Sequence, residues 1–96
     1  MTKKYIISVD QGTTSTRAIL YNKNLIPQNI HQIEIKQFYP KEGWVEQDPE
    51  EIWKSVKLCI NKLLLKSKVR STEIKSIGIT NQRETTILWN KKTGKP

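Results

Sequence analysis

The feature that most constrains how this chain folds is one amphipathic segment over residues 49–66. Asp48 is a suitable N-cap, Pro49 stands at the first helical position, and Glu51 completes a pair similar to a capping box. Lysines lie along the polar side and end the segment, which suits the helix dipole. The apolar positions at helical spacing are Ile52, Val56, Cys59, Ile60, Leu63 and Leu64. The spacing predicts a helix whose apolar face needs other elements to pack against.

Short apolar runs before this helix predict three β-strands. The first run covers residues 5–9 and the second covers residues 16–21, with a polar turn that contains Gly12 between them. Residues 26–35 alternate imperfectly between apolar and polar side chains. This imperfect alternation indicates a third, half-exposed strand with one irregularity.

Two further strands are predicted after the helix. Ile74, Ile77 and Ile79 lead into a polar corner, and a short apolar run covers residues 87–89. Residues 90–96 have the composition of a hairpin loop. Because that loop leads to no further strand, we expect the 96 residues to be the front of a longer protein.

Composition narrows the class of protein. A chain of 96 residues with 35% hydrophobic content can form one small domain, or a piece of a larger one, with a thin core. The single cysteine, Cys59, cannot form an intramolecular disulfide and is expected to pack in that core. There is no signal-peptide pattern, and no apolar run approaches the roughly 18 residues that span a bilayer. We therefore expect a soluble, cytoplasmic protein without membrane insertion.

The formal net charge of +8 raises the alternative of a small basic nucleic-acid-binding module. Much of the excess positive charge lies on the predicted helix and in the tail at residues 91–95, without interleaved aromatic or arginine side chains. A solvated lysine face explains this pattern better. We therefore expect no nucleic-acid partner.

Residues 10–17 form the first candidate site, directly after the first apolar run. Gly12 allows the backbone to turn tightly and to approach a bound group closely. Thr13, Thr14 and Ser15 add hydroxyl donors to main-chain N–H groups, a set that suits phosphate oxygens. The spacing differs from that of a Walker loop. An ordinary hairpin turn rich in glycine and threonine is the alternative interpretation.

Charged residues stand on both sides of this turn. Asp10, at the end of the first strand, offers a hard oxygen ligand for Mg²⁺. Arg17 can neutralise phosphate charge. Together with the turn, these residues predict a site for a metal-bound phosphate compound.

Residues 81–86 form the second candidate site, at the corner after the fourth predicted strand. Arg83 and Glu84 place donors and an acceptor side by side, which suits the neighbouring hydroxyls of a polyol. A surface salt bridge is the alternative. His31 has no second metal-ligating side chain at a suitable spacing, so we expect it to be a surface residue.

Taken together, the motifs resemble the N-terminus of the glycerol kinases within the FGGY carbohydrate kinase family. They are DQGTTSTR at residues 10–17, GWVEQDP at 43–49 and ITNQRETT at 79–86, followed by WNKKTGKP at 89–96. One departure is Gln47, where glycerol kinases commonly carry histidine. We interpret this position as part of a loop rather than of a site.

The resemblance implies a ribonuclease-H-like α/β domain of the actin-like ATPase class. It implies an antiparallel three-stranded meander, the helix, and further strands in one mixed sheet. Residues 1–96 would be the N-terminal part of the N-terminal domain of a two-domain kinase. The remainder of that domain and the C-terminal domain would lie outside these residues.

The resemblance also implies ATP-dependent phosphorylation of glycerol to sn-glycerol 3-phosphate. Asp10 would help to hold Mg²⁺, and Arg83 and Glu84 would bind glycerol hydroxyls. The residues expected at the ATP phosphates are Thr13, Thr14, Ser15 and Arg17.

The general base and the adenine-binding residues would lie beyond Pro96, so no catalytic residue is expected in these 96 residues. We therefore expect the isolated chain to be inactive. The alternatives are a nonfunctional remnant of a split or decayed kinase gene and, less favoured, the nucleic-acid-binding module.

Overall fold

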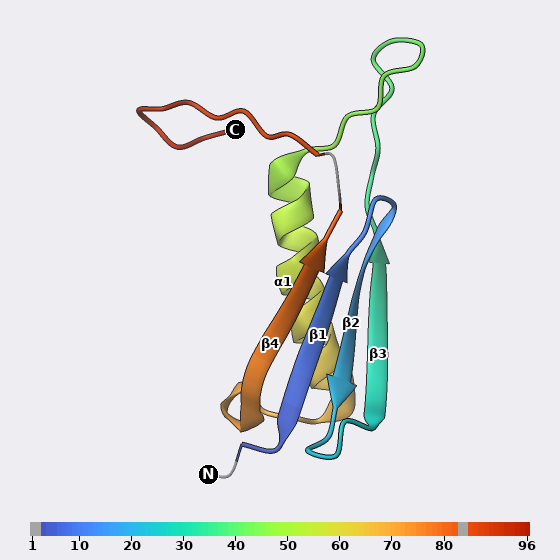
Figure 1. Ribbon diagram of the computed structural model, residues 1–96, viewed down its shortest axis with the longest axis vertical. Coiled ribbons are helices and arrows are strands. Elements are labelled where there is room, and N and C mark those ends of the chain that lie inside the picture. The colour runs from blue at the N-terminus through green and yellow to red at the C-terminus, as the bar shows by residue number, and fades with distance from the viewer. Residues whose placement is uncertain (1–2, 83–84) are drawn as a thin grey trace.

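The computed structural model describes residues 3–82 and 85–96, in which a mixed sheet carries one long helix on one face (Figure 1). Within these residues the sheet has four strands in the order β3-β2-β1-β4. The β1–β2 and β2–β3 pairs are antiparallel, and β4 runs parallel to β1. The elements are β1 Tyr5–Gln11, β2 Ser15–Tyr21, β3 Pro27–Glu34, α1 Pro49–Ser67, the 3₁₀ turn η1 Ser71–Glu73, and β4 Ile74–Asn81. The predicted meander and mixed sheet are confirmed.

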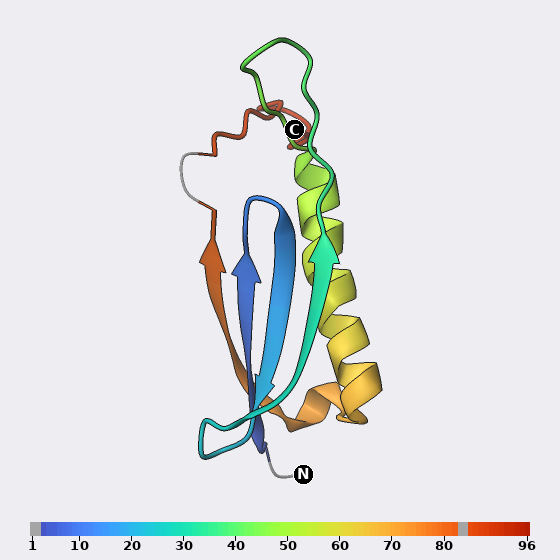
Figure 2. The same cartoon turned by 90° about the vertical axis from the view of Figure 1, so that its right-hand side faces the viewer.

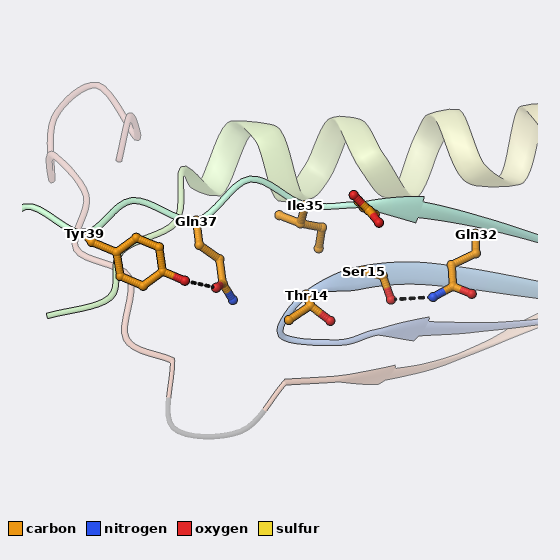
Figure 3. Close-up of a pocket in the computed structure, with 7 residues that line it drawn as sticks. Thr14, Ser15, Gln32, Ile35, Gln37 and Tyr39 are labelled. Carbon is orange, nitrogen blue, oxygen red and sulfur yellow. Dashed lines mark hydrogen bonds between the residues drawn. The ribbon is translucent and has the colours of Figure 1, made fainter. Parts of the chain in front are cut away.

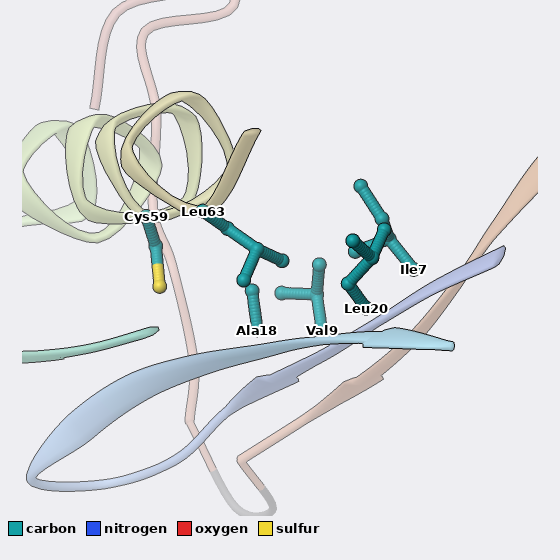
Figure 4. Packing of buried hydrophobic residues seen from close by; sticks show 6 residues of the cluster. All are labelled: Ile7, Val9, Ala18, Leu20, Cys59 and Leu63. Carbon is teal, nitrogen blue, oxygen red and sulfur yellow. The ribbon is translucent and has the colours of Figure 1, made fainter. Parts of the chain in front are cut away.

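The core lies between the sheet and α1 (Figure 4). Alternate residues of a strand point to the same face, so the helix-facing side chains of β1 and β2 meet in register. Ile7 pairs with Leu20, and Val9 pairs with Ala18. The buried cluster consists of Ile7, Val9, Ala18, Leu20, Cys59 and Leu63. This core is thin, as the length and hydrophobic content of the chain predict.

The predicted helix is confirmed over Pro49–Ser67. The Asp48 side chain accepts a hydrogen bond from the Glu50 N–H at 2.9 Å, which satisfies one of the unpaired donors of the first turn. The helix ends at Ser67, and the capping residue that follows it, Lys68, adopts a left-handed conformation with φ 55°. Polar capping at both ends therefore fixes the length of α1.

The helix covers only part of its side of the sheet. It packs mainly against β2 and β3, and Figure 2 shows it beside β3 with β4 at the far side of the sheet. Ile79 of β4 pairs in register with Val9 and so shares its face, yet Ile79 is 70% exposed. Within the described residues, the helix-side face of β4 is left uncovered.

One expectation about local structure is wrong. Residues 87–89 are not a strand: residues 85–90 run as irregular chain, and Leu88 is 84% exposed. Apolar residues alone do not make a strand, because its backbone groups need a paired neighbour. His31 was expected at the surface, and it is partly exposed. It pairs in unbroken register with the buried Ala18, so its side chain lies on the helix-side face of β3.

The turn predicted after residue 89 is present. The Asn90 carbonyl accepts from the Gly94 N–H at 2.7 Å, and the Asn90 side chain accepts from the Lys92 N–H at 2.8 Å. Gly94 has φ 75°, a conformation that favours glycine. Among the residues that the structure describes, no helix has the length and hydropathy needed to cross a bilayer.

Candidate functional site

The candidate site lies at the end of the sheet where β1 turns into β2. The β1–β2 turn, the start of α1 and the end of β4 all lie at this end of the molecule (Figures 1 and 2). The Gly12 N–H donates to the Ser15 carbonyl at 2.8 Å and closes the turn. A Cβ atom on Gly12 would lie 3.1 Å from that same oxygen, which is tight for a side chain. The closeness of the two backbone segments therefore favours glycine in this tight turn, and the approach of Gly12 to a bound group stays a prediction.

The carbonyl groups of residues 12–14 all accept hydrogen bonds from the protein. Gly12 O accepts from the Gln11 side chain at 2.9 Å, Thr13 O accepts from the side chains of Gln37 at 2.9 Å and of Gln47, and Thr14 O accepts from the Ile35 N–H at 2.8 Å. A peptide carbonyl and the N–H that follows it point to opposite sides of one rigid plane. Holding the carbonyls against the protein therefore directs the N–H groups of Thr13 and Thr14 the other way. Hydroxyls and outward N–H groups together suit an anion.

The turn residues line two different hollows. Thr14 and Ser15 border an open hollow of about 420 Å³ (Figure 3). There the Gln32 side-chain amide donates to Ser15 Oγ at 2.9 Å, and the Tyr39 hydroxyl donates to Gln37 Oε1 at 2.7 Å. Ser15 Oγ accepts in this bond, so its own proton is directed elsewhere.

Thr13 borders a second hollow of about 470 Å³ between the turn, the loop before α1 and the chain after β4. Gln47 and Gln82 line it with Thr13. Gln82 is followed directly by Arg83 and Glu84, the predicted polyol residues, which lie outside the described residues. The structure therefore brings the β1–β2 turn next to the residue that precedes Arg83 and Glu84 in the sequence.

Asp10 and Arg17 lie apart from both hollows. They are cross-strand partners on β1 and β2, and Arg17 Nη2 lies 3.5 Å from Asp10 Oδ2. Because both side chains are about half exposed, this ion pair adds little to stability. They alternate with Val9 and Thr16, which are buried, and so they project from the sheet face opposite α1.

The donor set near Asp10 can be compared with the needs of a metal ion. Among residues 3–82 and 85–96, no three metal-ligating side chains come together. A single carboxylate fits Mg²⁺, which keeps several waters and is commonly bound through one or two carboxylates plus substrate phosphates. A single carboxylate does not suit an ion whose ligands must all come from protein side chains.

The base of the turn is fixed to α1 by a buried polar contact. Thr16 Oγ1 lies 2.8 Å from Ser55 Oγ, and Ser55 Oγ donates to the Ile52 carbonyl at 2.6 Å. Thr16 is fully buried. Since buried hydroxyls are costly to leave unpaired, this contact sets the position of the turn relative to the start of α1.

Sequence reasoning missed the glutamines. Gln47 was expected to be a loop residue without a role in the site, but its side chain contacts the turn at Thr13 and accepts from Gln82 at 2.7 Å. Each of the three motifs contains one glutamine, at Gln11, Gln47 and Gln82. A side-chain amide both donates and accepts hydrogen bonds, so the recurrence of glutamine in the three motifs was the sequence signal for these contacts.

Comparisons with known proteins agree with this geometry. The N-terminal domain model of the FGGY family of carbohydrate kinases matches residues 5–96. Glycerol kinase from Halalkalibacterium halodurans is 55% identical over 96 residues, all of this chain and 19% of that protein. Glycerol kinase from Coxiella burnetii (strain RSA 493 / Nine Mile phase I) is 52% identical over 92 residues, 96% of this chain and 18% of that protein.

A solved structure also matches. The crystal structure of Plasmodium falciparum glycerol kinase with ADP aligns with a TM-score of 0.81 and 36% identity, over 99% of this chain and 19% of that one. The fold implied by the resemblance is thereby confirmed. The chain spans about a fifth of the length of the curated relatives that it matches.

Proposed function

Because this chain belongs to the FGGY family of carbohydrate kinases, we propose that it forms part of a site where ATP phosphorylates glycerol to sn-glycerol 3-phosphate. The observation that carries the proposal is the β1–β2 turn, whose carbonyls are held by the protein while Thr13 and Thr14 remain exposed. Relatives named glycerol kinase, at 52% and 55% identity, support glycerol as the acceptor.

In this proposal the turn binds the phosphates of ATP. Thr13 and Thr14 offer hydroxyls and outward N–H groups, and Ser15 offers a further hydroxyl proton. Arg17 turns from its weak pair with Asp10 toward phosphate oxygens, since a guanidinium matches their geometry. Neutralised charge and fixed position are what phosphoryl transfer mainly needs from a protein.

Asp10 is the residue proposed to hold Mg²⁺. The ion, when bound, neutralises charge on the phosphate oxygens. Asp10 lies near the end of β1, three residues before Thr13 in the sequence.

Arg83 and Glu84 are proposed to bind glycerol. They follow Gln82, which shares a hollow with Thr13. A guanidinium donates and a carboxylate accepts, so the pair satisfies both functions of neighbouring hydroxyls. The polyol would therefore be held close to the phosphates.

We assign residues 1–96 to the N-terminal part of the N-terminal kinase domain, with the general base and the adenine pocket supplied by other parts of such a kinase. The 96-residue polypeptide alone is then inactive. ATP and glycerol are the proposed partners. Neither nucleic acid nor membrane has a role, and the cytoplasm is the proposed location.

The proposal is tested with a hybrid, in which this chain replaces the matching residues of the Halalkalibacterium halodurans glycerol kinase. The hybrid should form glycerol 3-phosphate from ATP, Mg²⁺ and glycerol, and the 96-residue polypeptide should not. A folded hybrid that binds no ATP and makes no product would contradict the proposal. Turnover by the polypeptide alone would refute the assignment of the general base.

A further inference from the structure

Three glutamine side chains form a branched hydrogen-bond network above the β1–β2 turn. Gln82 Nε2 donates to Gln11 Oε1 at 3.1 Å and to Gln47 Oε1 at 2.7 Å. Gln11 Nε2 donates to the Gly12 carbonyl at 2.9 Å, and Gln47 Nε2 donates to the Thr13 carbonyl. One amide at the end of β4 is thus connected through two others to two consecutive carbonyls of the turn.

The two backbone carbonyls at which this network ends determine which group donates in each of its hydrogen bonds. A backbone carbonyl can only accept, so Gln11 and Gln47 must turn their NH₂ groups toward the turn. Their oxygens then face Gln82, which must offer its own NH₂ group to both. Gln82 therefore acts as a double donor, and both of its amide protons are used.

The surroundings make this direction costly to change. Gln11 is buried, and Gln47 and Gln82 are half-buried. If Gln11 or Gln47 flipped its amide, an oxygen would face a carbonyl oxygen with no proton between them. Reduced exposure limits the water that could compensate.

We propose that Gln82 is a positioning residue that fixes the peptide planes of the phosphate turn from the end of β4. It orients Gln11 and Gln47, which hold the Gly12 and Thr13 carbonyls toward the protein. The N–H groups of Thr13 and Thr14 are thereby kept on the side where a phosphate binds. Because Gln82 directly precedes Arg83, the same residue ties the phosphate turn to the polyol segment. The inference rests on the proposed function for its ligand, and on the described contacts alone for its geometry.

Three substitutions distinguish hydrogen-bond donation by the Gln82 side chain from packing of that side chain alone. Gln82→Glu keeps the size but replaces the double donor by an acceptor. Gln82→Lys supplies ammonium protons to the same two oxygens and serves as the rescue variant. Gln28→Glu is the matched control, because Gln28 also donates to a backbone carbonyl, that of Ile26 at 3.0 Å, far from the turn at the other end of β3.

Amide hydrogen exchange of the peptide covering residues 10–16, followed in the full chain, tests the geometry. Loss of two hydrogen bonds should loosen the turn, so the protected Gly12 N–H, which donates to the Ser15 carbonyl, should exchange about tenfold faster in Gln82→Glu. The Gln82→Lys and Gln28→Glu variants should exchange like the unchanged chain. Unchanged exchange in Gln82→Glu would overturn the inference, and so would exchange in Gln82→Lys as fast as in Gln82→Glu.

Kinetics in the hybrid test the consequence for the ligand. Gln82→Glu should raise the KM for ATP about tenfold, with a smaller change in the KM for glycerol. Equal ATP kinetics in Gln82→Glu and Gln28→Glu would overturn the positioning role. If the unsubstituted hybrid makes no product, the proposed function fails, while the exchange comparison still decides the inference about Gln82.

Discussion

At the scale of single residues, burial distinguishes side chains that pack in the core from side chains that a ligand can reach. Cys59 is fully buried, and its thiol donates to the His31 carbonyl at 3.1 Å. Burial raises the pKa of the Cys59 thiol, so little thiolate is present at neutral pH. Its helical spacing predicted this core position. The network of Gln11, Gln47 and Gln82 could not be predicted in the same way, because residues distant in sequence meet only in the folded chain.

We predict that Cys59 reacts slowly with a disulfide reagent such as DTNB in the native chain at pH 8. The rate should be at least about tenfold below that in concentrated urea, because both access and thiolate formation are restricted. Absorbance of the released thiolate measures both rates. Equal rates in buffer and in urea would show that Cys59 is not held in a packed core.

At the scale of elements, hydrophobic periodicity predicted β1, β2 and α1. Each has apolar residues at the spacing of its own secondary structure, and α1 also has capping residues. Periodicity failed at residues 87–89, since pairing depends on a neighbour that a local pattern does not reveal. On β3, His31 pairs in register with Ala18 and so lies on the helix-side face. Desolvation lowers the pKa of His31, and the positive charges of Lys66 and Lys62 on α1 lower it further.

This shift predicts that acid weakens the packing of α1 on β3. Because the pKa of His31 is lower in the folded chain than its usual value of 6.5, the unfolded chain binds more protons as the pH falls through 6.5. Stability should therefore decrease from pH 7.5 to pH 5.5. Urea unfolding at the two pH values measures the change. His31→Gln should show a smaller decrease, and an equal decrease in both proteins would contradict the assignment.

At the scale of the whole molecule, one layer of side chains joins the sheet to the helix. The six residues of the buried hydrophobic cluster come from β1, β2 and α1, while the helix-side face of β4 stays exposed. Composition predicted a thin core, but it could not indicate which part of the sheet the helix would cover, since that depends on strand order. The chain therefore has little reserve of stability.

Two leucines on α1 form a matched pair for testing this core. Leu63 is fully buried, whereas Leu65 is 77% exposed. Leu63→Ala should cost about 2–5 kcal/mol, enough to abolish cooperative unfolding in so thin a core. Leu65→Ala should change stability by less than about 0.5 kcal/mol. Thermal melts followed by circular dichroism measure both, and similar melts for the two variants would contradict the described packing.

We propose that the turn at Thr13 holds ATP and that Arg83 and Glu84 hold glycerol. Steady-state kinetics of the hybrid test it most directly, with each substrate varied in turn. Arg83→Ala should lower kcat/KM for glycerol about tenfold to a hundredfold, because a charge-assisted hydrogen bond is worth roughly 1.5–3 kcal/mol. Thr13→Val should instead weaken the use of ATP, with glycerol affinity little changed. If Arg83→Ala impairs ATP alone, or if neither substitution alters the kinetics, the account is contradicted.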